Sequence, residues 1–312
     1  MKKLLLILLC LPMIGFGQFT MIPDANFEQK LINLGYDNGA INGSVYTAMI
    51  NTITSLDVEY SNISDLTGIE DFTALTYLNC NSNQLTSLDV SQNTALTYLY
   101  CYSNQLTSLD VSQNTALIDL NCHINQITSL DVSANTALIN LYCLLNQLTS
   151  LDVSGATALT TLWCWDNQLT SLDVSQNTAL YRLNCNSNQL TSLDVSQNTA
   201  LTYLYCNSNQ LTSLDVRNGN NTNMVYFDSE SNPSLSCINV DDFQYSLFNW
   251  TYIDTQHYFS NNCSPSAIEE NSTNKELLKV TDLFGRETKG SKNEPLFYIY
   301  DDGTVEKKII LK

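Results

Sequence analysis

A repeat of 21 residues runs through the middle of this 312-residue chain and constrains its fold more than any other feature. Most copies read L-x-x-L-x-C-x-x-N-Q-[LI]-T-S-L-D-V-S-x-x-T-A. Looser copies begin at Ile53 and end near Asn232, which makes about nine copies in all. A unit this short cannot bury its own apolar face, so successive units must stack into a solenoid.

Each column of the repeat has a physical role in such a stack. The Leu columns point inward and form one continuous core, with neighbouring coils about 4.8 Å apart, as in paired strands. The repeated cysteines are Cys80, Cys101, Cys122, Cys143, Cys164, Cys185 and Cys206, and an Asn follows each of them by three positions. These asparagines are expected to bond to the backbone of adjacent coils and so form a ladder.

The motif L-x-x-L-x-[LC]-x-x-N-x-L resembles the hallmark of the leucine-rich-repeat family. Leu75, Leu78, Cys80, Asn83 and Leu85 match it, as do the six coils that follow. The resemblance covers roughly residues 53–235 and implies a leucine-rich-repeat solenoid. The remaining half of each unit, L-T-S-L-D-V-S-x-N-T-A, is too short and too β-branched for a regular helix. We therefore expect a mostly β fold.

The first 17 residues have the pattern of an export signal. Lys2 and Lys3 form a basic start, an apolar stretch follows, and Gly15 and Gly17 precede Gln18 at the expected cleavage point. The stretch is too short for a comfortable membrane span, and no other segment could cross a membrane. A lipoprotein alternative based on Cys10 is disfavoured, because only six apolar residues precede it and the bulky Leu9 stands where a small residue is expected.

Both ends of the solenoid carry candidate caps. Residues 18–52 form the amino-terminal cap, in which Asp24 can begin a short helix with Phe27, Leu31 and Ile32 on one face, and Gly35 can end it. Residues 236–263 form the carboxy-terminal cap, rich in aromatic residues and bounded by two cysteines. Because the protein is expected to be exported, Cys237 and Cys263 are predicted to form a disulfide. Residues 264–276 are predicted to be a linker.

The final segment, residues 277–312, alternates apolar and polar residues as strands do, with a hairpin turn expected at Asp302-Gly303. It resembles the carboxy-terminal sorting tails read by the type IX secretion system of some Gram-negative bacteria. The matching residues are Val280, Asp282, Gly285 and Arg286, then 298–303 and 307–312. The resemblance implies contact with the secretion machinery and delivery out of the cell or to its outer surface. The alternative is a small terminal hairpin packed on the cap.

Two further columns invite metal hypotheses. A straight column of cysteines cannot surround one zinc ion tetrahedrally, and its spacing does not suit disulfides, so these residues are expected to be buried, reduced core side chains. The aspartate column is Asp89, Asp110, Asp131, Asp152, Asp173, Asp194 and Asp215. Each is expected to accept hydrogen bonds from turn amides and the following Ser, with calcium between coils as the alternative. A weaker alternative is an ice-binding array of Thr and Ser.

The copies differ mainly at the outward positions of L-x-x-L-x-C-x, where Tyr, Trp and Asn dominate. Variation confined to one face fits a concave recognition surface. The aromatic residues predicted to bind are Tyr98, Tyr100, Tyr102, Tyr142, Trp163, Trp165, Tyr203 and Tyr205. Trp163 and Trp165, two residues apart on one strand, are the expected centre. The alternative is that Tyr and Asn are simply tolerated on exposed strands.

Composition and motifs narrow the function. The net charge of −18 disfavours nucleic acid as a partner. The sequence contains none of the common hydrolase or phosphate-binding motifs, so no catalytic residue and no cofactor is predicted. The sequence therefore predicts a secreted or cell-surface binding protein that recognises a protein or a glycan. The alternatives are a glycan-active enzyme that uses the same concave face, where Asp119 and Asp166 flank aromatic residues but are too few carboxylates for a persuasive glycosidase pair, and a structural or adhesive array.

Overall fold

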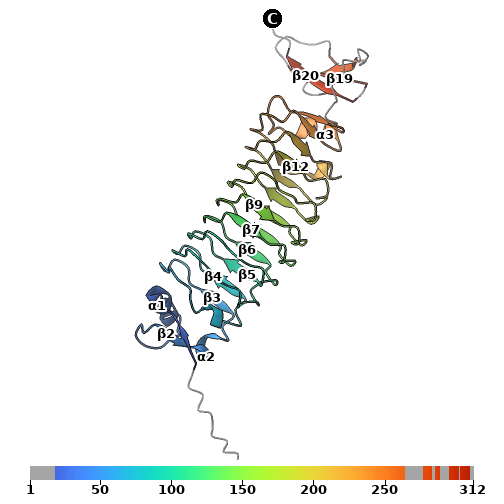
Figure 1. The fold of residues 1–312 in the computed structure, drawn as a ribbon. Helices are drawn as coiled ribbons and strands as arrows, with labels where there is room; N and C mark the ends of the chain where they lie inside the picture. Colours follow the sequence, from blue (N-terminus) through green and yellow to red (C-terminus); the bar gives the residue numbers. More distant parts are fainter. Residues whose placement is uncertain (1–17, 264–276, 283–284, 289–294, 302, 310–312) are drawn as a thin grey trace, which may run out of the picture.

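The computed structural model describes residues 18–263, 277–282, 285–288, 295–301 and 303–309. In this part the coils stack into an elongated solenoid, with a small cap at one end and the short β tail beyond the other (Figure 1). The predicted signal (1–17, with Cys10), the linker (264–276) and Asp302 lie outside the described residues. The mostly β leucine-rich-repeat fold predicted from the repeat is confirmed.

The amino-terminal cap combines a two-stranded antiparallel sheet with two short helices. The elements are β1 (Phe19–Met21), α1 (Ala25–Asn33), β2 (Ser44–Tyr46) and α2 (Thr47–Ile50). As predicted, Asp24 caps α1, because its Oδ1 accepts the amides of Asn26 and Phe27 at 2.9 and 3.0 Å. Its Oδ2 accepts the amide of Ser64 at 2.8 Å, which ties the cap to the first coil.

One parallel sheet of nine strands runs the length of the solenoid, one strand for each coil. Its strands are β3 (Ser55–Asp57), β4 (Tyr77–Asn79), β5 (Tyr98–Tyr100), β6 (Asp119–Asn121), β8 (Asn140–Tyr142), β10 (Thr161–Trp163), β11 (Arg182–Asn184), β13 (Tyr203–Tyr205) and β15 (Tyr226–Asp228). Equivalent residues pair between neighbouring coils, as in Leu141 opposite Leu162. The sheet is therefore in register with the sequence repeat.

The opposite side of each coil is built from short strands and turns rather than regular α-helices. A first pair is β7 (Ser129–Asp131) with β9 (Ser150–Asp152), and a four-stranded sheet contains β12 (Ser192–Asp194), β14 (Ser213–Asp215), β16 (Cys237–Asn239) and β17 (Tyr258–Ser260). Single 3-10 turns occur at η1 (Ile69–Asp71) and η2 (Asn221–Asn223). The β-branched half of the repeat thus takes the extended and tight-turn forms expected of it.

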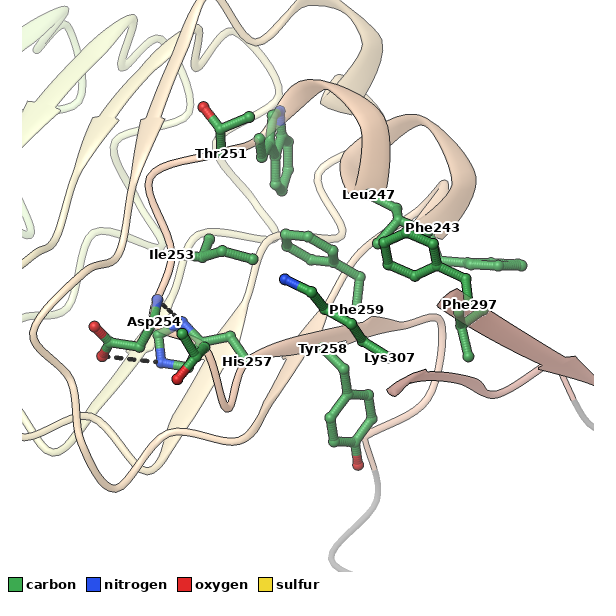
Figure 2. A pocket seen from close by; sticks show the side chains of 13 residues that line it. Phe243, Leu247, Thr251, Ile253, Asp254, His257, Tyr258, Phe259, Phe297 and Lys307 are labelled. Atoms are coloured by element: carbon green, nitrogen blue, oxygen red, sulfur yellow. Dashed lines mark hydrogen bonds and ion pairs between the residues drawn. The ribbon is translucent and has the colours of Figure 1, made fainter. Parts of the chain in front are cut away.

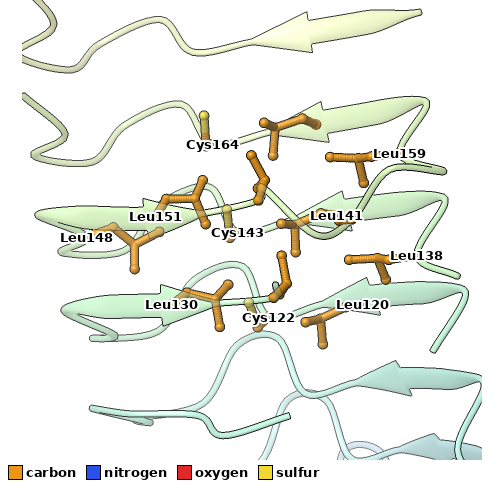
Figure 3. Packing of buried hydrophobic residues seen from close by; sticks show 14 of the residues in the cluster. Leu120, Cys122, Leu130, Leu138, Leu141, Cys143, Leu148, Leu151, Leu159 and Cys164 are labelled. Carbon is orange, nitrogen blue, oxygen red and sulfur yellow. The ribbon is translucent and has the colours of Figure 1, made fainter. Parts of the chain in front are cut away.

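The core between the two sides is a set of stacked Leu and Cys columns (Figure 3). Leu120, Leu141 and Leu162 are fully buried, and so are all seven ladder cysteines, which are free thiols. Burial raises the pKa of the Cys80 thiol to about 12, so it stays protonated at neutral pH. The prediction of reduced, buried core cysteines is confirmed for the ladder.

The predicted asparagine ladder is present beside the cysteines. Asn125 shows the pattern: its Nδ2 donates to the carbonyls of Cys101 and Cys122 at 3.1 Å each, and its Oδ1 accepts the amide of Leu106 at 2.9 Å. Asn104, Asn167, Asn188 and Asn209 are buried with the same bonds, whereas Asn83 and Asn146 are only half-buried. Each rung therefore joins two coils through backbone groups that have no strand partner.

A second asparagine ladder, which the sequence analysis missed, runs along the other side of the core. Its fully buried members are Asn93, Asn114, Asn135, Asn177 and Asn198. Asn114 Nδ2, for example, donates to the carbonyls of Val90 and Asn93 at 2.9 Å each. Ala156 interrupts this ladder, and beside it an ideal Cβ on Gly155 would lie 1.7 Å from the Ser133 carbonyl oxygen. Only glycine allows that approach.

The carboxy-terminal cap and tail close the far end. Helix α3 (Phe243–Asn249) packs against β17, and Cys237 and Cys263 form the predicted disulfide. The tail is an antiparallel sheet of β18 (Leu277–Thr281), β19 (Pro295–Tyr300) and β20 (Val305–Ile309), in which β19 and β20 form the expected hairpin. Strand β20 lies against β17, so the tail contacts the cap. Among the described residues, no helix has the length and apolar character needed to cross a membrane.

Candidate recognition face

The candidate site is the outer face of the nine-stranded sheet, called the recognition face below. In each strand the central residue is buried in the core and its two neighbours point outward, as in Tyr98 and Tyr100 around Leu99. In-register pairing places equivalent outward residues of successive coils side by side, for example Thr161, Arg182 and Tyr203. The sheet therefore brings side chains 21 residues apart in the sequence into contiguous columns.

The eight predicted binding residues all lie on this face or at its strand ends, but they are less exposed than we expected. Tyr98 is 38% exposed, whereas the other seven are half-buried. Their neighbours cover part of each ring, because the coils stand at strand spacing and large rings on adjacent coils must pack together. The face is thus an ordered surface of partly shielded rings rather than a row of freely exposed ones.

Ring contacts divide the face into groups. Toward the amino terminus, Tyr77 meets the edge of Tyr100 at 5.6 Å between ring centroids, and Tyr102 stacks on His123 at 4.4 Å. At the centre, Tyr142 and Trp163 meet at 5.4 Å with their planes at 90°. This perpendicular contact of Tyr142 and Trp163 holds the two rings in a defined mutual orientation.

A cation lies next to the central aromatic pair. The guanidinium of Arg182 is 4.7 Å from the centroid of the Tyr203 ring and 5.5 Å from that of Tyr181, which holds an exposed positive charge in place. Among the described residues, Arg182 is the one basic side chain on the strands of the long sheet. Sequence reasoning did not select it, although its place in the outward column could have identified it.

A stacked trio of rings at the carboxy-terminal end extends the face beyond the predicted residues. Tyr226 stacks on Tyr205 at 4.4 Å and on Tyr252 at 5.3 Å. Strand pairing places Tyr226 opposite Tyr203, although the intervening coil is longer than the usual repeat. That longer coil broke the 21-residue register, so the sequence analysis did not include Tyr226 or Tyr252 in the aromatic strip.

Asp119 sets the electrostatics of the amino-terminal half of the face. Burial raises the pKa of its carboxyl, and Asn140 Nδ2 donates to it at 2.9 Å. Burial and the nearby Asp119 charge raise the pKa of Tyr100 to about 12, so this phenol keeps its proton at neutral pH. The face therefore presents hydroxyl donors and amide groups between apolar ring surfaces, which suits polar ligands with apolar patches.

The two carboxylates considered for glycan hydrolysis do not form a pair. Asp119 lies on β6, whereas Asp166 follows β10 in a turn with a φ of +56°, and strand β8 separates β6 from β10. His123 is half-buried, stacks on the ring of Tyr102 and forms a hydrogen bond with Asn121 Oδ1. The face does not bring these groups into a general acid–base arrangement.

The aspartate column lies on the opposite side of the coils, and six of its seven members are held as predicted, whereas Asp215 accepts the amide and the guanidinium of Arg217. Asp89, Asp110 and Asp152 each accept the amide of the residue two positions later, in every case a Ser, at 2.9 Å. The Ser amides lower the pKa of Asp89 and Asp110, and the Ser154 side chain together with its amide lowers the pKa of Asp152. In the described part of the chain, no group of three or more His, Cys, Asp or Glu residues has the geometry to hold a metal ion. Calcium at this column stays an untested alternative.

Comparisons with known proteins show which proteins this chain and its fold are similar to. No known protein-family profile matches the chain. A segment of 71 residues is 41% identical to internalin J of Listeria monocytogenes, a match that spans 23% of this chain and only 8% of that protein. The crystal structure of an internalin, InlF, from the same species covers 77% of this chain and 71% of its own, with 24% identity and a TM-score of 0.60. A structure of the functional domain of InlJ, described as including a cysteine ladder, covers 72% of this chain and 66% of its own, with 32% identity and a TM-score of 0.36.

The stacked coils, the in-register sheet and the asparagine ladders define a leucine-rich-repeat protein. Within that fold class the arrangement is similar to that of solved internalin structures, which shows the fold. Because the chain spans a small part of the curated relative it matches, what the whole internalin does is not transferred to it.

Proposed function

We propose that this protein is an exported binding protein whose recognition face takes a protein or peptide segment, or a glycan. The site is built for recognition rather than turnover, since its aromatic, amide and hydroxyl groups lack a paired acid and base. A strand-spaced face of this length suits an extended ligand that can contact several coils at once. The fold supports this proposal because repeat solenoids commonly present such extended binding surfaces.

One observation carries the proposal: residue variation is concentrated on the recognition face. The opposite side repeats T-S-L-D-V-S in nearly every coil, whereas the outward strand positions change from Tyr98 and Tyr100 to Thr161 and Trp163 and then to Arg182 and Asn184. A purely structural stack has no need for this asymmetry, since any polar residue tolerates an exposed strand. Aromatic and Arg side chains are also the types that dominate binding hot spots.

The test uses a double substitution at the centre of the face. Trp163→Ala with Trp165→Ala should weaken ligand binding at least thirtyfold, since truncating a central Trp commonly costs about 2 kcal/mol or more. The ligand would first be selected by probing peptide and glycan arrays with residues 18–312. Thr170→Ala with Ser171→Ala, on the opposite side of the same coil, is the matched control and should leave binding unchanged.

The outcomes separate the competing functions. Selective binding to an arrayed peptide or glycan that the Trp variant loses supports the proposal. Turnover of an arrayed glycan would instead establish the enzyme alternative, and binding without selectivity would establish the adhesive array. Equal ligand affinity of the Trp variant and the control variant would show that the recognition face does not bind the ligand.

We also propose that the segments at the chain ends direct delivery. Residues 1–17 would direct export, and residues 277–312 would address the protein to the type IX machinery and the outer surface of a Gram-negative cell. The tail's strand pattern and its resemblance to sorting tails support this. Deleting residues 277–312 should leave the protein in the periplasm, as followed by cell fractionation. Unchanged surface display of the deletion variant would refute the sorting role.

A further inference from the structure

A cavity of about 260 Å³ lies where the carboxy-terminal cap meets the tail (Figure 2). Its walls are mainly apolar side chains from α3, the segment after it, β17 and β19: Phe243, Leu247, Trp250, Ile253, Phe259 and Phe297. Cavities of about 150 Å³ with such walls can already hold benzene. This cavity is therefore large enough for the apolar body of a small molecule.

The tail contributes one cation to the cavity. Lys307, on β20, is an exposed side chain that lines the cavity, and Figure 2 shows it directed toward the cap. In the described part of the chain Lys307 has no ion-pair partner. An ammonium group at an apolar cavity attracts an anionic group on a ligand whose body fills that cavity.

Two titratable groups of the cap that line the cavity, Asp254 and His257, are engaged in bonds within the cap. Asp254 accepts the amides of Ser231 and Asn232 at 2.8 Å each, and its carboxylate points away from Lys307 in Figure 2. His257 accepts the Asp254 amide at Nδ1, 3.2 Å away, and its Nε2 lies 3.3 Å from the Asn232 carbonyl. Burial lowers the pKa of His257, so the imidazole is neutral at neutral pH. Neither group neutralises Lys307.

Trp250 adds an unused donor to the wall. Its side chain is 3% exposed, and its Nε1 is buried without a hydrogen-bond partner among the described residues. Buried indole N–H groups usually find an acceptor. A ligand with an apolar body and an anionic oxygen group would suit the apolar walls and Lys307 together.

From these contacts we propose that the junction of cap and tail binds a small amphiphilic carboxylate, with its hydrocarbon or aromatic body between Phe259 and Phe297 and its carboxylate at Lys307. The charge of Lys307 decides which class of ligand binds. An amine would be repelled by Lys307, and a neutral apolar molecule would leave its ammonium without a partner. Cap and tail residues alone form the site, and none of the eight predicted binding residues of the recognition face lines it.

The experiment uses the fluorescence of Trp250 in the full exported chain. Phe at positions 163 and 165 (Trp163→Phe, Trp165→Phe) leaves Trp250 as the one remaining tryptophan of three. Octanoate is the probe, and octanol and octylamine are the matched neutral and cationic compounds. Octanoate should change the Trp250 emission saturably and bind about fivefold tighter than octanol, the preference expected of one exposed ion pair.

Two substitutions test the role of Lys307. Lys307→Met keeps the apolar stem and should make octanoate and octanol bind equally, whereas Lys307→Arg should retain the preference for octanoate. Lys279→Met, on β18 of the same tail, should leave the preference intact. Emission that does not saturate with octanoate, or equal affinity for octanoate and octanol in the parent chain, would overturn the proposal. Because Trp163 and Trp165 are already replaced, the result does not depend on what the recognition face binds.

Discussion

Replacing Asn188 with Ala tests whether the asparagine ladder holds neighbouring coils together. Asn188 is 8% exposed. Its Oδ1 accepts the amide of Leu169 at 3.0 Å, and its Nδ2 donates to the carbonyls of Cys164 and Cys185 at 3.0 and 3.2 Å. One side chain thus serves backbone groups from two coils, none of which has another role in the strand pairing.

The magnitude follows from what each group loses. The Leu169 amide has no other partner, and an unpaired buried donor costs about 1–3 kcal/mol. The two carbonyls are less affected, because Asn167 and Asn209 still donate to them at 3.1 and 3.0 Å. Adding a modest loss for these two bonds gives about 2–4 kcal/mol in the free energy of unfolding. For a domain of this size, that corresponds to a fall of very roughly 10 °C in melting temperature.

The assay is urea unfolding followed by far-ultraviolet circular dichroism, with hydrogen exchange at the Leu169 amide as a local probe. Gln189→Ala, at the exposed next position, is the control and should change stability by less than about 0.5 kcal/mol. Asn146→Ala should cost less than Asn188→Ala, since Asn146 is half-buried and water can reach the freed groups. If Asn188→Ala and Gln189→Ala have the same midpoint, the ladder does not stabilise the stack.

Three further predictions concern the coils themselves. Gly155→Ala should lower the free energy of unfolding by about 1–3 kcal/mol or more, because the new Cβ would collide with the Ser133 carbonyl. Gln176→Ala, at the exposed equivalent position of the next coil, is the control and should be nearly neutral. Equal melting temperatures of the two variants would contradict this prediction. Ile124→Asn should raise the melting temperature, because a β-branched residue at a φ of +52° is strained and Asn adopts that conformation more easily. A lower melting temperature would show that the contacts of the Ile side chain stabilise the protein more than the backbone strain destabilises it. Hydrogen bonds from Ser amides hold the pKa of Asp89 and Asp110 below the unfolded value. The stabilisation they give is therefore complete above about pH 4 and is lost as the pH falls below it. The double variant Asp89→Asn with Asp110→Asn should reduce the loss of stability between pH 7 and pH 3 in urea unfolding, and an unchanged pH profile would refute the assignment.

Regular spacing is the reason the sequence predicted so much of the solenoid. A residue that recurs every 21 positions must meet its own copies in the stack, so one column predicts a whole ladder of contacts. The Asn125 rung, the buried Cys122 and the hydrogen bond from Ser112 to Asp110 all follow from this rule. The Cys237–Cys263 disulfide was predictable for a different reason, since both cysteines stand outside the ladder.

The recognition face was only partly predictable. Alternation along a strand identified which side chains point outward, including Tyr98 and Trp163. It did not indicate that stacking on adjacent coils would half-bury most of the rings. It also missed Tyr226 and Tyr252, because a coil of different length separates them from the regular copies.

By itself, then, the sequence determined the solenoid, its mostly β character and the register of its columns, because these depend on a local period that stacking repeats. The tertiary structure alone decided contacts between residues that share no period. Gly155 against Ser133 depends on how closely two particular coils approach. The cavity that joins Phe259 of the cap to Phe297 and Lys307 of the tail depends on how the tail folds back on β17, and such long-range packing is set by shape and burial rather than by spacing along the chain.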